Sequence, residues 1–201
     1  MMIKIKICGI CRDRDVDYVN LSQPDYIGFV FAKSRRRVSF NEAARLRSRL
    51  SDRITPVGVF VNSPAEDIAA LYHRGTIALA QLHGSEDEDY ISTLRRICKI
   101  PVIKAVAVEG IGDIERWQKI PADFLLLDSG PGGTGKSFDW GLITDIKKPF
   151  FLAGGINQEN LFEAKRKNPF CIDISSGAET KGAKDPQKIA RLVEMVRRGD
   201  F

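Results

Sequence analysis

Eight short apolar runs, rich in β-branched and aromatic residues, recur along the whole sequence. Each run has the length of a buried strand, and segments of helical character separate them. A regular alternation of strand and helix predicts parallel strands joined by crossover helices. The runs are Ile3–Ile7, Tyr26–Phe31, Val57–Val61, Ile77–Leu82, Val102–Val106, Phe124–Leu127, Phe150–Ala153 and Phe170–Ile174.

Helix start signals occur in several of the intervening segments. A helix over Asn41–Leu50 is predicted with Asn41 as its N-cap, and one over Ser63–His73 with Ser63 as its cap and proline at the first helical position. Segment 136–146 has the weakest helical pattern, so we expect one helix of the fold to be vestigial. The other predicted helices are Ser85–Cys98, Asn157–Lys167 and a last helix that starts at Asp185-Pro186.

The number of strands favours a closed barrel over an open sheet. Open doubly wound sheets usually have five or six strands, and many carry a glycine-rich dinucleotide loop after the first strand. Here Cys8-Gly9-Ile10-Cys11 follows the first run and does not match that loop. We therefore predict a single (β/α)8 barrel domain over residues 1–201, with loops trimmed below the ~250 residues typical of this fold.

Composition narrows the possible partners and location. No apolar stretch is long enough to span a membrane, and the N-terminal MMIKIKICGI alternates like a strand instead of resembling a signal peptide, so the cytoplasm is the expected location. A net charge of +5 fits an anionic small molecule or nucleic acid. The basic triplet 35–37 lacks the aromatic residues of RNA-binding motifs, so no nucleic-acid partner is expected.

Polar residues lie at or near the ends of the predicted strands. In a barrel of parallel strands, the active site gathers where strands end and βα loops begin. We therefore expect one polar pocket built from the strand-end residues Cys8, Arg35–Arg37, Asn62, His83, Lys104 and Asp128.

The loops after the seventh and eighth strands are rich in small residues. Gly154-Gly155 and Ser175-Ser176-Gly177 would let backbone N–H groups approach a phosphate. Barrels commonly bind phosphate after these two strands, so this site is predicted here. A third loop, 132–136, includes Gly133 and could close over the ligand, but it lacks the spacing of a P-loop.

A set of motifs along the whole chain resembles the phosphoribosylanthranilate isomerase family. The motifs stand in family order, and together they are highly specific. They are KICG at 6–9, GFVF at 28–31, SRR at 34–36, VGVFVN at 57–62, QLHG at 81–84, LLLD at 125–128, GGTGKSFDW at 132–140, AGGIN at 153–157 and DISSGAE at 173–179.

The resemblance implies an Amadori rearrangement in tryptophan biosynthesis, performed without a metal or cofactor. It implies Cys8 as general base, Asp128 as general acid and Arg36 as the partner of the anthranilate carboxylate. Gln81 and His83 are expected to bind substrate, and the protein to be a monomer or homodimer. The expected phosphate-binding residues are Gly133, Gly154, Gly155, Ser175 and Ser176.

The chemistry independently suits these residue types. Opening a furanose needs a proton on the ring oxygen, which a carboxylic acid such as Asp128 supplies if its pKa is raised in a partly apolar pocket. The resulting Schiff base makes the C2 proton acidic, and a thiolate at Cys8 removes it if nearby cations lower its pKa.

Two alternatives stay open at this level. One is another phosphosugar enzyme of the tryptophan or histidine pathway on the same barrel. The other is a redox or metal-binding protein, because Cys11 completes a C-x-x-C with Cys8. Cys11 stands where the family pattern leads us to expect threonine, and we predict that mild oxidation links it to Cys8.

Overall fold

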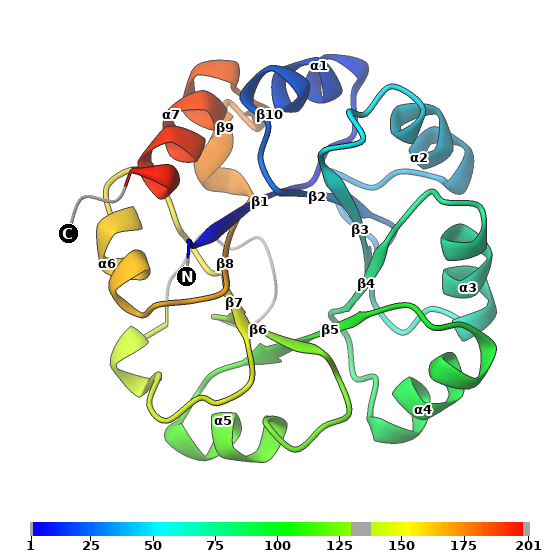
Figure 1. The fold of residues 1–201 in the computed structure, drawn as a ribbon, viewed down its shortest axis with the longest axis vertical. Helices are drawn as coiled ribbons and strands as arrows, with labels where there is room; N and C mark the ends of the chain where they lie inside the picture. Colours follow the sequence, from blue (N-terminus) through cyan, green and yellow to red (C-terminus); the bar gives the residue numbers. More distant parts are fainter. Residues whose placement is uncertain (1, 130–137, 199–201) are drawn as a thin grey trace.

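Eight parallel strands close into a barrel in the computed structural model, which describes residues 2–129 and 138–198 (Figure 1). Each strand pairs with its sequence neighbour, and β1 pairs with β8 to close the ring. The predicted (β/α)8 barrel is therefore confirmed. The strands are β1 Lys4–Cys8, β2 Tyr26–Val30, β3 Thr55–Phe60, β4 Leu79–Leu82, β5 Val102–Ala107, β6 Phe124–Asp128, β7 Phe150–Leu152 and β8 Cys171–Ile174.

Helices form an outer ring around the strands (Figure 1). Two of them, α1 and α5, were not identified from the sequence. Between β6 and β7 the described residues form only the 3-10 turn η1, Trp140–Leu142, which agrees with the expectation of one vestigial helix. The α-helices are α1 Asp13–Ser22, α2 Phe40–Arg47, α3 Ala65–His73, α4 Glu88–Ile97, α5 Ile111–Trp117, α6 Leu161–Arg166 and α7 Pro186–Arg197.

Several predicted helix starts were wrong by a few residues. Ser39, not Asn41, caps α2, because its side chain accepts a hydrogen bond from the Glu42 N–H while the Glu42 carboxylate binds the backbone of Ser39. Pro64, not Ser63, stands at the N-cap of α3, without a side-chain cap. The last helix starts as predicted, with Asp185 as its cap.

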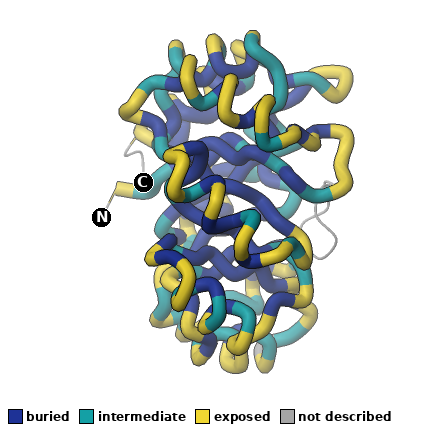
Figure 2. The backbone as a smooth tube through the Cα atoms, turned by 90° about the vertical axis from the view of Figure 1, so that its right-hand side faces the viewer, coloured by how far each residue is buried: buried dark blue, intermediate teal, exposed yellow. Residues whose placement is uncertain are grey.

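Two apolar layers hold the barrel together. The larger lies between the strands and the helices, where Ile5, Ile7 and the inner stripe of α7 are almost completely buried. The smaller fills the barrel interior with aromatic rings, Tyr26 packing edge-on to Phe151. In Figure 2 buried backbone accordingly runs through the middle of the molecule and exposed backbone lies outside. In barrels of this kind the interior is packed, and the active site is built at the carboxyl-end face.

A small antiparallel hairpin, β9 Glu179–Thr180 and β10 Ala183–Lys184, follows the 3-10 turn η2, Ser176–Ala178, after β8. The sequence analysis did not identify this hairpin. It lies beside the β1–α1 connection at the rim of the barrel (Figure 1). Among the described residues no helix has both the length and the apolar character needed to cross a bilayer.

Candidate active site

A cavity of about 540 Å³ opens at the carboxyl ends of the strands. Residues from β1, β4, β6 and β8 and from the loops after β2 and β7 line it. Another hollow, of about 580 Å³, lies on the outside between α1 and α7 and contains none of the predicted site residues. The first cavity is lined by all the residues predicted as catalytic, substrate-binding or phosphate-binding except Gly133, which lies outside the described residues: Cys8, Arg36, Gln81, His83, Asp128, Gly154, Gly155, Ser175 and Ser176.

Cys8 is the last residue of β1 and contributes its side chain to the cavity. Burial raises the pKa of its thiol above the ordinary value, although the ammonium groups of Lys6 and Lys184 act in the opposite direction. Cations of the kind that a thiolate needs are thus present beside Cys8, but they do not fully offset desolvation. The predicted role of Cys8 as base therefore requires a small thiolate population or a thiolate that forms when the site is occupied.

Asp128 ends β6, so its carboxyl group enters the cavity from another part of the ring than Cys8. Its Oδ1 accepts a hydrogen bond from the Ser129 backbone N–H at 2.7 Å, and its Oδ2 lies 3.6 Å from His83 Nε2. Burial raises the pKa of Asp128, whereas a charged His83 would lower it. A carboxyl group with a raised pKa is suited to hold a proton and donate it.

At the bottom of the cavity, polar side chains from several strands contact one another inside the barrel. Lys6 Nζ donates to Asp173 Oδ2 at 2.7 Å and to Gln81 Oε1 at 2.8 Å. Gln81 Nε2 is 2.9 Å from His83 Nδ1. Lys6 and Asp173 were not identified from the sequence as site residues, although each is a charge inside an apolar run. We call Asp173, Lys6, Gln81 and His83, together with Asp128, the floor network.

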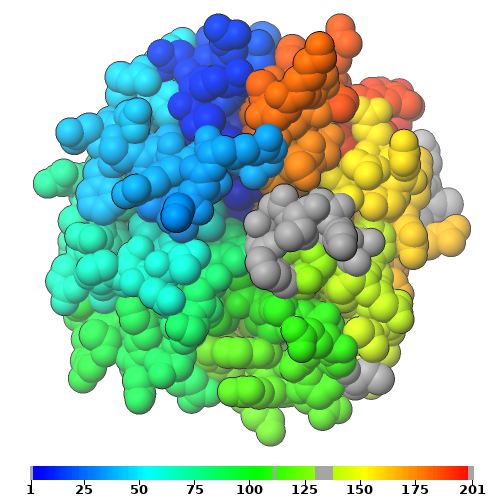
Figure 3. All heavy atoms as spheres, turned by 180° about the vertical axis from the view of Figure 1, so that it is seen from behind, coloured from blue at the N-terminus to red at the C-terminus, as the bar shows by residue number. Residues whose placement is uncertain are grey.

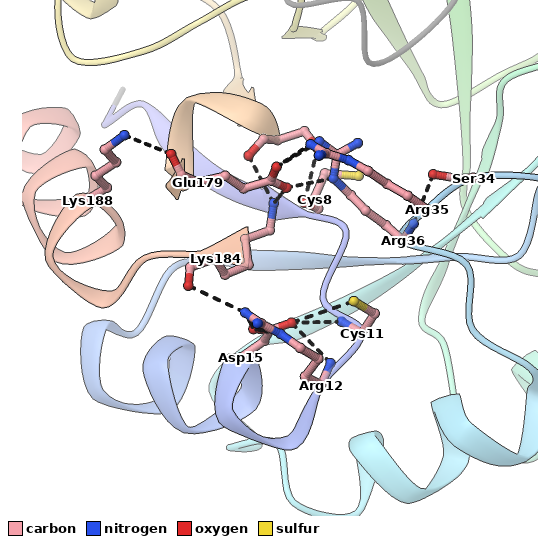
Figure 4. A network of polar contacts seen from close by, with 11 residues as sticks. Cys8, Cys11, Arg12, Asp15, Ser34, Arg35, Arg36, Glu179, Lys184 and Lys188 are labelled. Carbon is pink, nitrogen blue, oxygen red and sulfur yellow. Dashed lines mark hydrogen bonds and ion pairs between the residues drawn. The ribbon is translucent and has the colours of Figure 1, made fainter. Parts of the chain in front are cut away.

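A second network lies at one side of the cavity, to whose lining it contributes Arg36 (Figure 4). Glu179 accepts from Arg36 Nε at 2.6 Å and Nη2 at 3.0 Å, from Arg35 Nη2 at 2.5 Å and from Lys184 Nζ at 2.8 Å. It thereby joins the loop after β2 to the hairpin after β8, which lie side by side in Figure 3 as the light-blue and orange segments. We call Arg35, Arg36, Glu179 and Lys184 the rim network.

The rim network leaves excess positive charge beside the cavity. Three cations contact a single carboxylate. Burial would raise the pKa of Glu179, but the contacts with Arg36 and Lys184 lower it to about 2. Glu179 occupies the Nε–Nη2 side of the Arg36 guanidinium. Within residues 2–129 and 138–198 no side chain hydrogen-bonds the Nη1 of Arg36, so the Nη1–Nη2 end of this guanidinium suits a second anion. This arrangement fits the predicted role of Arg36 toward a carboxylate.

Two glycines make the close approach of these groups possible. Gly9 has φ of +85°, and a Cβ there would lie 2.3 Å from Arg36 Cδ. A Cβ on Gly28 would lie 2.7 Å from Cys8 Sγ. Both glycines stand in the quoted motifs, but their role depends on side chains from neighbouring strands, which no local pattern shows.

The predicted phosphate loops meet on one side of the cavity. Gly154 and Gly155 adopt positive φ of +86° and +62°, and a Cβ on Gly177 would lie 2.0 Å from the Ile156 carbonyl oxygen, so the two loops touch. The predicted helix after Gly154-Gly155 was placed too early, because α6 starts only at Leu161. Any phosphate contact by these loops therefore uses turn backbone and not the end of a long helix.

Four of the expected strand-end residues do not line the cavity: Arg35, Arg37, Asn62 and Lys104. Lys104 instead donates to the Gly84 carbonyl oxygen at 2.7 Å and contacts Glu86 at 3.3 Å. Glu86 also accepts the Asn62 and Gly84 N–H groups. Because this cluster fixes the loop directly after His83, its effect on the site is indirect.

Cys11 has a local partner. Its thiol lies 3.8 Å from Asp15 Oδ2, and Asp15 also binds Arg12 in the capping box of α1. In Figure 4 this cluster lies apart from Cys8 and is joined to the rim network by the hydrogen bond from Arg12 Nη2 to the Lys184 carbonyl oxygen at 3.5 Å. All four cysteines are free thiols, so the oxidative Cys8–Cys11 bond stays a prediction. The barrel also differs from the thioredoxin-like fold that a redox C-x-x-C usually occupies.

Known proteins similar to this chain share both its sequence and its fold. The family model of N-(5'-phosphoribosyl)anthranilate isomerase matches residues 5–195. The enzyme of that name from Endomicrobium trichonymphae is 50% identical over 201 residues, covering 98% of this chain and 99% of the relative. That of Clostridium acetobutylicum is 42% identical over 206 residues, with the same coverage.

Solved structures agree with this result. The phosphoribosyl anthranilate isomerase of Thermotoga maritima superimposes with a TM-score of 0.88 at 35% identity, over 97% of this chain and 98% of that one. A structure of such an isomerase in complex with reduced 1-(o-carboxyphenylamino)-1-deoxyribulose 5-phosphate gives 0.84 at 35% identity, over 96% and 97%. The chain therefore belongs to the N-(5'-phosphoribosyl)anthranilate isomerase family.

Proposed function

We propose that this protein catalyses the Amadori rearrangement of N-(5-phosphoribosyl)anthranilate to 1-(2-carboxyphenylamino)-1-deoxyribulose 5-phosphate, a step of tryptophan biosynthesis. The observation that carries the proposal is one cavity lined by a thiol, a carboxyl group of raised pKa and a partly free guanidinium, in a chain of this family. No metal or organic cofactor takes part in the proposed steps.

The first step assigns Asp128 as general acid. Its proton passes to the furanose ring oxygen while the bond between that oxygen and C1 breaks, and the anthranilate nitrogen forms a Schiff base with C1. Burial favours the protonated form of Asp128 that this step consumes. The carboxylate left behind is stabilised by the Ser129 N–H on Oδ1.

The second step assigns Cys8 as general base. Its thiolate takes the C2 proton of the Schiff base, the electrons move toward nitrogen, and the resulting enolamine tautomerises to the ketone. Lys6 and Lys184 favour this thiolate, and the Ser175 hydroxyl donates to the Cys8 carbonyl oxygen at 3.3 Å and so supports its backbone. Cys8 and Asp128 act in succession on one bound molecule.

Charge at the two ends of the substrate would determine its orientation. We assign the anthranilate carboxylate to the free end of Arg36, where the rim network supplies excess positive charge. The phosphate is assigned to the loops that contain Gly154, Gly155, Ser175 and Ser176, which touch through Gly177. Gly133 is proposed as a further phosphate contact from the sequence motif alone.

Substitutions in the two anion sites separate these assignments. Gly155→Val and Ser176→Leu crowd the phosphate loops, so inhibition by inorganic phosphate or a sugar phosphate should weaken about tenfold or more. Anthranilate-bearing product analogues should lose more affinity in Arg36→Met. Equal losses for both ligand types in every variant would contradict the proposed orientation.

A fluorescence assay tests the activity itself. Phosphoribosylanthranilate, generated enzymatically, is added to the purified protein, and its fluorescence should decay as the product forms. A parallel reaction with the aminoaldose of histidine biosynthesis tests the alternative phosphosugar activity. Turnover of the aminoaldose without loss of the anthranilate fluorescence would overturn the proposed function.

We further propose, as the sequence leads us to expect, that the protein acts in the cytoplasm as a monomer or homodimer. One similar solved structure is described as a generated monomer of the dimeric isomerase of Thermotoga maritima, so both states are compatible with this fold. Light scattering on the purified protein distinguishes the two states, and a larger assembly would contradict this expectation.

A further inference from the structure

The floor network forms a continuous chain of contacts from β8 to β6. Asp173 Oδ2, Lys6 Nζ and Gln81 Oε1 are linked at 2.7 and 2.8 Å. Gln81 Nε2 then lies 2.9 Å from His83 Nδ1, and His83 Nε2 lies 3.6 Å from Asp128 Oδ2. Lys6 has no exposed surface, and Gln81 has only 2%. Groups so buried and linked in series have few alternative partners.

Lys6 determines which way the Gln81 amide faces. Burial alone would lower the Lys6 pKa, but the Asp173 carboxylate raises it above the ordinary value, so the amine is an ammonium group. An ammonium group only donates hydrogen bonds, so the Gln81 atom that it contacts must be the amide oxygen. The amide nitrogen must then face His83.

The Gln81 amide in turn determines the tautomer of His83. An amide nitrogen only donates, so His83 Nδ1 has to accept and cannot carry a proton. The charged groups that influence the ring are Asp128 from β6, Lys6 from β1, Asp173 from β8 and Lys104 from β5. Burial lowers the pKa of His83, which favours the neutral ring. Its single proton is therefore on Nε2, facing Asp128.

We propose that Lys6 and Gln81 are positioning residues that hold His83 as the neutral Nε2–H tautomer, so that its N–H stabilises the Asp128 carboxylate formed when the acid gives up its proton. This inference rests on the proposed function. It gives Gln81 and His83 a role in acid catalysis, beyond the substrate binding that the family resemblance implies.

The proton balance of this arrangement is simple. The Asp128 proton goes to the furanose ring oxygen, and the electrons of the breaking C1–O bond stay on that oxygen. His83 keeps its own proton throughout, and its Nε2–H faces Asp128 Oδ2 with 3.6 Å between nitrogen and oxygen, while the Ser129 N–H donates to Oδ1 at 2.7 Å. The opposite tautomer would place the Nε2 lone pair against the carboxylate and an N–H against the Gln81 amide hydrogens.

Nitrogen-15 NMR of histidine-labelled protein tests the tautomer without depending on activity. The chain has two histidines, and the exposed His73 serves as an internal reference. At neutral pH we expect a protonated Nε2 and an unprotonated Nδ1 for His83. Finding the proton on Nδ1 in the wild type would overturn the proposal, even if the isomerase activity is present.

Gln81→Glu tests the control by Gln81. One carboxylate oxygen can still bind Lys6, but the other accepts a hydrogen bond, so His83 should acquire a proton on Nδ1. The NMR signals of His83 should then change to the Nδ1–H or doubly protonated form, and kcat should fall about tenfold or more. An unchanged His83 tautomer in this folded variant would contradict the role of Gln81.

A pair of His83 substitutions distinguishes hydrogen-bond donation from packing. The Gln side chain in His83→Gln can place an N–H near the position of Nε2, whereas the shorter Asn in His83→Asn cannot reach it. We expect His83→Gln to retain at least about tenfold more kcat than His83→Asn, with a smaller difference in KM. Equal kcat values would overturn the proposal. Absence of activity in the wild type would instead refute the proposed function.

Discussion

The floor and rim networks are built from different parts of the barrel. The floor network uses strand residues of β1, β4, β6 and β8 with His83 directly after β4, and its Lys6 and Gln81 are almost completely buried. The rim network uses the β2–α2 loop and the β9–β10 hairpin, and its Arg35 side chain is 56% exposed, although Arg36, Glu179 and Lys184 are buried. Paired strands fix positions to a fraction of an ångström, whereas loops can adjust.

This contrast suggests a division of labour. Proton transfer needs groups held within hydrogen-bonding distance of the reacting atoms, which strands provide. Anion binding depends on charge and tolerates side-chain movement. We therefore expect changes at the floor to act mainly on kcat and changes at the rim mainly on KM.

The largest effect among the supporting residues is expected for Gly28→Ala. The added Cβ would lie 2.7 Å from Cys8 Sγ and 3.2 Å from its Cα, so Cys8 has to move. A displacement of about 1 Å can cost on the order of 10²-fold in rate, so kcat should fall by this order with a smaller change in KM. Gly112→Ala is the control, because a Cβ there meets no atom within 4 Å. Equal steady-state constants for the two variants would refute this role of Gly28.

Arg36→Met should act in the opposite way. Loss of a charge-assisted contact of ~1.5–3 kcal/mol raises KM about tenfold or more, while kcat changes less. Arg35→Met is the matched control, since its exposed side chain also binds Glu179 but does not line the cavity. A reduced kcat with an unchanged KM in Arg36→Met would contradict the expectation that changes in the rim network act mainly on KM.

The sequence predicted the barrel and the positions of Cys8 and Asp128 because both depend on local features, whereas the proposed roles of these two residues rest on the family resemblance. Each apolar run ends within one residue of the end of its strand, so Cys8 and Asp128 were placed correctly at the carboxyl ends of β1 and β6. Helix α1 was missed because its segment, DRDVDYVNLS, has few apolar residues, and the Arg12–Asp15 capping box was not recognised.

Strand alternation explains the error at Lys104 and the omission of Lys6. Side chains two residues apart share a face of a strand, so Lys6 points inward like Cys8. Lys104 lies between Ile103 and Ala105 of the interior core, and therefore points outward. The alternation of inward and outward side chains along a strand therefore predicts Lys6 inside the barrel and Lys104 outside it. Glu179 could not be predicted, since its contacts with Arg36 arise only when the closed barrel brings two distant loops together.

A smaller effect is expected from Glu179 on stability. Its folded pKa of about 2 lies below the ordinary value, so its contribution is present above the unfolded pKa and is lost as pH falls through the folded one. Wild type should therefore lose its advantage over Glu179→Gln between about pH 4.5 and 2. Urea unfolding at several pH values measures this, and a difference that stays constant with pH would contradict the ion pairing.

The smallest expected effect is a shift in the reactivity of Cys8. Because burial raises the pKa of this thiol, its alkylation by iodoacetamide in the free enzyme should have a midpoint above the ordinary cysteine value. Lys184→Met should move the midpoint further upward, since this lysine favours the thiolate. Peptide mass spectrometry in a Cys11→Thr background isolates the signal. A midpoint near neutrality would mean that the cations outweigh burial.

The most direct test of the account is the pair Cys8→Ala and Asp128→Asn in the fluorescence assay. Each variant should retain near-normal affinity for the reduced product analogue and lose about 10²–10⁴-fold in kcat, because the base or the acid is absent from an otherwise intact cavity. If either variant keeps a kcat close to that of the wild type, its assigned role as base or acid is wrong.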